Sequence, residues 1–110
     1  MTEEDRAVFT GIVEAQQAGQ PCALATVIAT QGSTPRKNGA KMLVRPEGLV
    51  GTVGGGCGEA QVIEAAQEVM ASGLPRIVQV DLTDDPLAWT GSVCGGLLRV
   101  FVEPVLPPRQ

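Results

Sequence analysis

Apolar positions near the N-terminus recur with the spacing of a helix. Val8, Ile12 and Ala15 lie three or four residues apart and form one apolar stripe. Thr2 is a favourable N-cap residue, and the acidic residues that follow it suit the positive end of a helix dipole. Gly19, which a proline follows closely, is typical of a helix end. The pattern therefore predicts a first helix between Thr2 and Gly19.

The rest of the chain predicts strands and a second helix. The run CALATVIAT at Cys22–Thr30 is almost entirely apolar, which is typical of a strand buried on both faces. A three-residue connection at 46–48 that contains a glycine predicts a hairpin. The second helix is expected at Glu59–Ala71, and the other strands at Lys41–Arg45, Leu49–Val53, Arg76–Leu82 and Leu97–Glu103, with loops at 31–40 and 83–96.

This order of elements predicts the fold class. Helix, strand, hairpin, helix, strand, loop and strand make a single α+β or α/β domain, with a mixed sheet of about five strands and two helices. A length of 110 residues fits one domain. We place that domain at residues 1–105, followed by a proline-rich tail at 106–110 that frays or leads to a partner.

Composition excludes several classes of function. No apolar run reaches the roughly 18 residues of a membrane helix, and the acidic start has the wrong charge for a secretory signal. A net charge of −4 disfavours binding to nucleic acid or to an anionic membrane. Three cysteines without such a signal indicate a reducing compartment, so we expect a cytoplasmic protein. Histidine is absent, which excludes Ser-His-Asp and Cys-His catalysis and histidine zinc sites within the chain.

Charge is distributed unevenly. The segment 15–46 contains no acidic residue, yet it holds the four bases Arg36, Lys37, Lys41 and Arg45. This pattern indicates either a solvated loop and hairpin face or a site for a small anion.

Glycine is concentrated in the same part of the chain. Eight of the 14 glycines fall between Gly32 and Gly58. The densest run, GTVGGGCGE at 51–59, lies at a strand-to-helix junction, where successive amide groups and the helix start form an anion-binding nest. It is neither a P-loop nor a dinucleotide fingerprint, because the residues that close those motifs are missing. A helix start also favours a thiolate at Cys57. Glu59 either caps the helix or belongs to the site.

A second cysteine motif, Cys94-Gly95-Gly96, ends the long loop at 83–96. Long loops without regular structure are frequently functional. Zinc is disfavoured, because Cys57 and Cys94 have no closely spaced partners to complete four ligands. Cys22 opens an apolar strand and is expected in the core.

A third segment, Gly32-Ser33-Thr34-Pro35-Arg36, combines hydroxyl groups with a guanidinium. These groups suit an anionic, oxygen-rich ligand, although a polar turn fixed by Pro35 explains them equally well. The glycine-rich segments follow apolar strands, so we expect them to meet at one end of the sheet.

The runs ATVIATQGSTPRKNGAKMLV, GLVGTVGGGCGEAQVIEAA and VCGGLLRVFVEP, in this order, resemble the XdhC/CoxI family. The resemblance covers about residues 8–105. It implies a chaperone that binds molybdenum cofactor (molybdopterin) transiently, protects it while a sulfido ligand replaces an oxo ligand, and inserts it into a xanthine dehydrogenase or carbon monoxide dehydrogenase apoenzyme. Implied further partners are a cysteine desulfurase and a separate protein with the Rossmann-like domain that many members carry and this sequence lacks.

The resemblance also assigns candidate residues. Position by position, the family motifs fall on Gly32, Ser33, Pro35 and Gly39, on Gly54, Gly55, Gly56, Cys57 and Glu59, and on Cys94, Gly95 and Gly96. The cluster of Arg36, Lys37 and Lys41 suits the cofactor phosphate, and Cys57 or Cys94 suits a molybdenum contact. Gly58 departs from the pattern, because a larger apolar residue is common there.

Two alternative functions remain open at this point. One is a thiol enzyme for sulfur relay or redox chemistry, with a persulfide or a transient disulfide at Cys57 and Cys94. Another is a non-catalytic small subunit. Independently of either, a homodimer is one way for a small domain to cover apolar surface.

Overall fold

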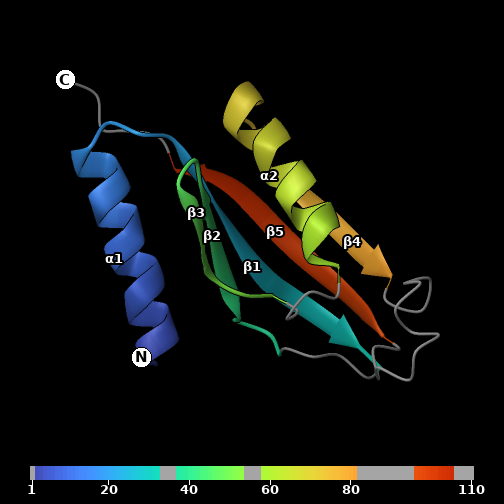
Figure 1. Cartoon of the computed structure of the whole chain (residues 1–110). Helices are drawn as coiled ribbons and strands as arrows, with labels where there is room; N and C mark the ends of the chain where they lie inside the picture. Colours follow the sequence, from blue (N-terminus) through green and yellow to red (C-terminus); the bar gives the residue numbers. More distant parts are fainter. Residues whose placement is uncertain (1, 33–36, 54–57, 82–95, 106–110) are drawn as a thin grey trace.

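The computed structural model describes residues 2–32, 37–53, 58–81 and 96–105, which form two helices and one five-stranded sheet (Figure 1). Neither helix in these ranges has the length and apolar character needed to cross a membrane. The elements in chain order are α1 (Glu3–Gln17), β1 (Cys22–Gln31), β2 (Lys41–Arg45), β3 (Gly48–Gly51), α2 (Glu59–Ser72), β4 (Arg76–Asp81) and β5 (Leu97–Val105).

Helix α1 begins where the sequence predicts. The Thr2 hydroxyl accepts a hydrogen bond of 3.0 Å from the Asp5 amide, and the Thr2 amide donates one of 3.5 Å to the Asp5 carboxylate. This reciprocal capping box satisfies amide groups that have no partner inside the helix. The helix ends at Gln17, and Gly19 follows with a left-handed φ of 69°.

The sheet is antiparallel throughout the described residues. Its strand order is β3-β2-β1-β5-β4, and each neighbouring pair is antiparallel. The α+β class is confirmed, but the expected mixed sheet is not. Strands β3 and β4, which α2 connects, do run in the same direction. They lie at opposite edges with three strands between them, so no parallel pair forms.

The two helices pack on opposite faces of the sheet (Figure 1). Side chains of β1 alternate between two cores, since Cys22 and Leu24 pack with α1 whereas Ala23 and Ala25 pack with α2. The predicted burial on both faces therefore holds for the first half of β1. It does not hold for the second half, where Ile28 is 44% exposed.

Two strand boundaries differ from the prediction. Strand β3 ends at Gly51, two residues early, and β5 continues past Glu103 through Pro104. Strand β4 pairs with β5 only as far as Val102. At Pro104 one side of β5 consequently has no neighbouring strand, and a proline is tolerated there because no ladder hydrogen bond is lost.

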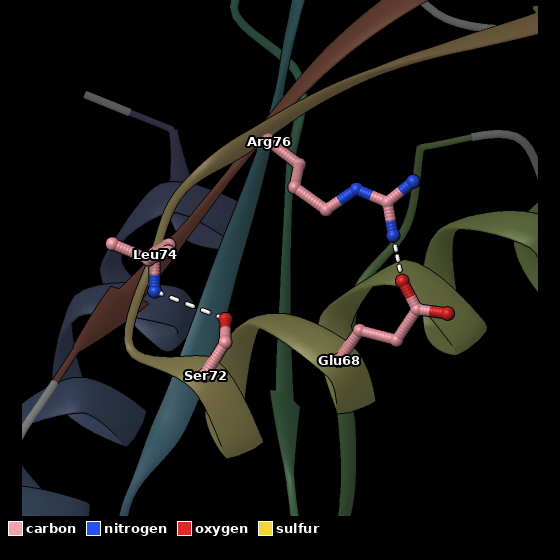
Figure 2. A network of polar contacts seen from close by, with 4 residues as sticks. All are labelled: Glu68, Ser72, Leu74 and Arg76. Carbon is pink, nitrogen blue, oxygen red and sulfur yellow. Dashed lines mark hydrogen bonds and ion pairs between the residues drawn. The ribbon is translucent and has the colours of Figure 1, made fainter.

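The turn after α2 sets the start of β4 (Figure 2). Gly73 ends the helix with a left-handed φ of 75°, and the Ser72 hydroxyl accepts a hydrogen bond of 3.1 Å from the Leu74 amide. An ion pair joins Glu68 on α2 to Arg76, the first residue of β4. The predicted helix end at residue 71 is thus confirmed to within one residue.

Helix α1 packs on β2 and β3, so it covers only part of its face of the sheet. On the same face, β4 and β5 present Ile77, Gln79 and Arg99 as exposed side chains beside the half-buried Phe101. We call these four residues the open face.

Candidate functional site

One end of the sheet gathers the residues that flank two of the three motif segments. Strands β1, β3 and β4 run in the same direction, and β1 and β4 end there, at Gln31 and Asp81. Strand β3 ends earlier, because Gly51 pairs with Met42, which pairs with Ala25, six residues before Gln31. Leu97, which opens β5, pairs with both Gln31 and Asp81. We call this the motif end of the sheet; it lies at the lower right of Figure 1.

The predicted site residues divide into two groups. Gly32, Gly39, Lys41, Glu59 and Gly96 lie within the described ranges. Gly32 and Gly96 adjoin the motif end, whereas Lys41 pairs with Thr26 in the middle of β1. The remaining candidates lie outside the described residues: Ser33, Pro35, Arg36, Gly54, Gly55, Gly56, Cys57, Cys94 and Gly95.

Glu59 is held by a residue to which the sequence assigned no role. The Thr52 hydroxyl, just after β3, donates a hydrogen bond of 2.6 Å to the Glu59 carboxylate at the first turn of α2. Both residues are half-buried. Thr52 precedes the 54–57 segment and Glu59 follows it. The hydrogen bond therefore holds the residues on either side of this segment close together. The sequence contains only a weak signal for this pair. Thr52 stands two residues before a glycine run, and Glu59 is an acidic residue at the predicted helix start.

Gly58 has a conformation that suits glycine. It is the N-cap of α2, with a left-handed φ of 75°, and no side-chain cap hydrogen bond is present. A residue with a Cβ is strained in this region. The helix start therefore presents its first amide groups without a capping side chain, which is the arrangement expected of an anion-binding helix end.

Two residues of the predicted basic cluster, Lys37 and Lys41, lie near the start of α1, and Lys41 has a hydrogen-bond partner there. The Lys41 ammonium donates a hydrogen bond of 2.9 Å to the Gly39 carbonyl. Lys37 and Lys41 line a hollow of about 520 Å³ together with Thr2 and Asp5 at the start of α1. The Asp5 carboxylate offsets part of the positive charge there, which makes this hollow less selective for anions.

A second hollow, of about 260 Å³, opens on the open face at the motif end. The sequence did not single out its residues. Among the described residues that line it, the one charged side chain is Arg99, which follows the Cys94-Gly95-Gly96 motif by three positions and interrupts the apolar pattern of β5. The lining residues are Ala29, Thr30, Gln31, Gln79, Leu97 and Arg99.

Cys22 is confirmed as a core residue. Its side chain is fully buried, and its thiol donates a hydrogen bond of 3.8 Å to the Val105 carbonyl. Burial raises the pKa of the Cys22 thiol, and the nearby Arg45 guanidinium only partly opposes this. The thiol is therefore protonated at neutral pH and a poor nucleophile. Within the described ranges, no three His, Cys, Asp or Glu residues form a group that could hold a metal.

A comparison with known protein families shows to which family this chain belongs. The sequence model of the XdhC and CoxI family matches residues 15–81. The chain belongs to the XdhC and CoxI family. The matched range begins in α1 and ends with β4, so it includes two of the three motif segments, at residues 32–36 and 54–57.

Three curated relatives are similar to most of this chain. The uncharacterized protein YqeB of Escherichia coli is 36% identical over 97 residues, 87% of this chain. The molybdenum cofactor insertion chaperone PaoD of Escherichia coli is 36% identical over 80 residues, 72% of this chain. A probable xanthine dehydrogenase subunit of Bacillus subtilis is 30% identical over 90 residues, 79% of this chain. The chain spans only 18%, 25% and 27%, respectively, of these proteins.

A solved structure shares the fold. The crystal structure of a protein described as a xanthine dehydrogenase from Bacillus halodurans has a TM-score of 0.74 and 39% sequence identity. The match covers 90% of this chain and 30% of that one. In these relatives the domain is thus one part of a longer chain.

Proposed function

We propose that this domain binds molybdenum cofactor as cargo and serves as a maturation factor for a molybdenum hydroxylase. It holds the cofactor while a sulfido ligand replaces an oxo ligand, then releases it to the apoenzyme. The relative PaoD, a molybdenum cofactor insertion chaperone, supports the cargo, and family membership supports the role. Binding is transient, because a carrier must give up its cargo.

The observation that carries this proposal is that the flanks of two motif segments lie side by side at the motif end. Strand β5 lies between β1 and β4, and neighbouring strands lie about 4.8 Å apart, so Gln31 and Asp81 lie on either side of Leu97 within about 10 Å of each other. The third segment follows β3, which runs in the same direction but ends six residues before the end of β1. One small molecule at the motif end is therefore within reach of groups from the segments next to Gly32 and Gly96.

The chemistry of the segments fits an anionic pterin with a phosphate and a dithiolene-bound metal. Amide groups at Gly54–Gly56 and at the start of α2 suit an anionic oxygen. A thiolate from Cys57 or Cys94 suits molybdenum or the sulfur that is delivered to it. The sulfur source in this scheme is a cysteine desulfurase, and a protein with a Rossmann-like domain is a further partner. Free thiols at Cys57 and Cys94 require a reducing compartment, so we place this function in the cytoplasm.

Direct binding of the pterin tests the proposal. The purified protein is mixed with molybdopterin released from a molybdoenzyme and passed through a desalting column, and the retained pterin is measured by fluorescence after oxidation. We expect near-stoichiometric retention by the wild type and a loss of at least tenfold in Cys57→Ser. Cys22→Ser is the matched control and retains the pterin, because Cys22 lies in the core.

Two results would contradict the carrier role. If the wild-type protein retains no molybdopterin, the cofactor is not its cargo. Mass spectrometry that finds a persulfide on Cys57 or Cys94 after treatment with a sulfur donor, in protein that binds no pterin, would instead assign a sulfur relay.

A further inference from the structure

A bulge in β1 shapes the hollow on the open face. The register between β1 and β5 shifts between Val27 and Ala29, so that Ala29 lies opposite Arg99. A regular ladder would place the larger Ile28 there, because Val27 pairs with Val100. The bulge thereby puts the smaller of two neighbouring side chains beside the guanidinium. Bulges of this kind commonly occur next to functional sites, where they re-aim a side chain.

The groups around this hollow are polar and can bind a ligand. Arg99 is exposed and has no ion pair or hydrogen bond with any residue in the described ranges. Gln31 and Gln79, which lie on the same face of the sheet as Arg99, line the same space. Its described lining contains no carboxylate. Asp81, the acid two positions beyond Gln79 on β4, already has a partner of its own.

The chemistry of these groups selects an anion with several oxygens. A guanidinium donates two parallel hydrogen bonds to a phosphate, and carboxamide N–H groups donate to its remaining oxygens. Half-buried Leu97 forms one wall and excludes part of the water, which strengthens these contacts. The hollow about the lysines is a weaker candidate, because Asp5 lines it and Lys41 already donates to a backbone carbonyl.

We propose that Arg99, with Gln31, Gln79 and the space left by Ala29, forms a subsite for a phosphate monoester. Resting on the proposed function, we assign it the phosphate of the pterin cargo. The subsite adjoins two motif segments directly, since Gln31 precedes Gly32 and Leu97 follows Gly96. In this assignment, Cys57, Cys94 and the glycine amides of residues 54–56 remain for the metal end of the cargo.

Three substitutions separate charge from shape. Arg99→Gln removes the guanidinium, Ala29→Leu fills the hollow and keeps the charge, and Arg99→Lys keeps the charge but loses the bidentate geometry. Arg76→Gln is the matched control, because Arg76 is an exposed arginine on β4 that pairs with Val102 on the opposite face. Circular dichroism and thermal melting check that each variant is folded.

The readouts are molybdopterin retention and titration with inorganic phosphate. We expect Arg99→Gln and Ala29→Leu to weaken both by about 10- to 100-fold, as the loss of a charge-assisted contact predicts. Arg99→Lys falls between, and Arg76→Gln matches the wild type. Folded Arg99→Gln protein that binds phosphate and pterin like the wild type would overturn the subsite.

The phosphate titration also keeps the two proposals separable. If the wild type binds phosphate through Arg99 but retains no molybdopterin, the anion subsite stands and the proposed cargo fails. If all four variants retain molybdopterin as well as the wild type does, the cargo stands and the subsite fails.

Discussion

The Thr52 hydroxyl donates a hydrogen bond of 2.6 Å to the Glu59 carboxylate, across the glycine segment that contains Cys57. Thr52 follows the edge strand β3 and Glu59 opens α2, so the bond joins the sheet to the helix. A hydrogen bond to a charged acceptor is stronger than one between neutral groups. The pair therefore fixes the position of the helix start relative to the sheet.

We expect Thr52→Val and Glu59→Gln each to lower the free energy of unfolding by about 1–2 kcal/mol. The double variant should lose less than the sum of the two, because the first substitution already breaks the shared contact. Urea titrations measure all three values. Glu64→Gln, at an exposed position on the same helix, is the control and should stay close to wild type. Fully additive losses would show that the two side chains do not act as a pair.

Gly51 and Gly73 offer a matched test of backbone strain against crowding. Both have a left-handed φ, of 78° and 75°, but a Cβ at Gly51 would lie 2.5 Å from the Lys41 carbonyl oxygen, whereas space is open at Gly73. Gly73→Ala should destabilise by about 1 kcal/mol through strain alone. Gly51→Ala should cost more than about 2 kcal/mol, because backbone must also move. Equal losses in urea unfolding would contradict the crowding at Gly51.

The pH dependence of stability should report the buried Cys22 thiol. Burial raises its folded pKa above the ordinary 9.0, so the native state keeps the proton over a range in which the unfolded chain loses it. Stability is therefore full below pH 9.0 and falls as the pH rises through the folded pKa. Cys22→Ala should flatten this decline relative to wild type in thermal melts at several pH values. A decline of the same slope in the variant would assign it to other groups.

The ion pair between Glu68 and Arg76 should contribute little to stability. Both side chains are about half exposed, at 56% and 49%, so water and salt screen the attraction. Glu68→Gln is expected to change the free energy of unfolding by less than about 0.5 kcal/mol. Val69→Ala, at the neighbouring buried position, should cost about 1–3 kcal/mol and shows that the assay is sensitive. A large loss in Glu68→Gln would mean that the turn into β4 depends on the pair.

Much of the secondary structure was predictable, because its causes are local. The cap at Thr2, the stop near Gly19 and the apolar run from Cys22 act on residues close in sequence, and the structure confirms them. The prediction ended the last strand at Glu103 and left out Pro104, and the reason is non-local. Whether a proline fits in β5 depends on where β4 stops pairing, and no pattern within β5 contains that information.

For the candidate site, the sequence alone determined which residue types stand in the motif segments and that strands lead into them. Only the tertiary structure decided the antiparallel strand order, the bond between Thr52 and Glu59, and the bulge that sets Ala29 opposite Arg99. Each of these depends on residues that are distant along the chain or on the pairing register between strands. Local propensity does not encode such pairings, because they form only when the whole sheet packs between its two helices.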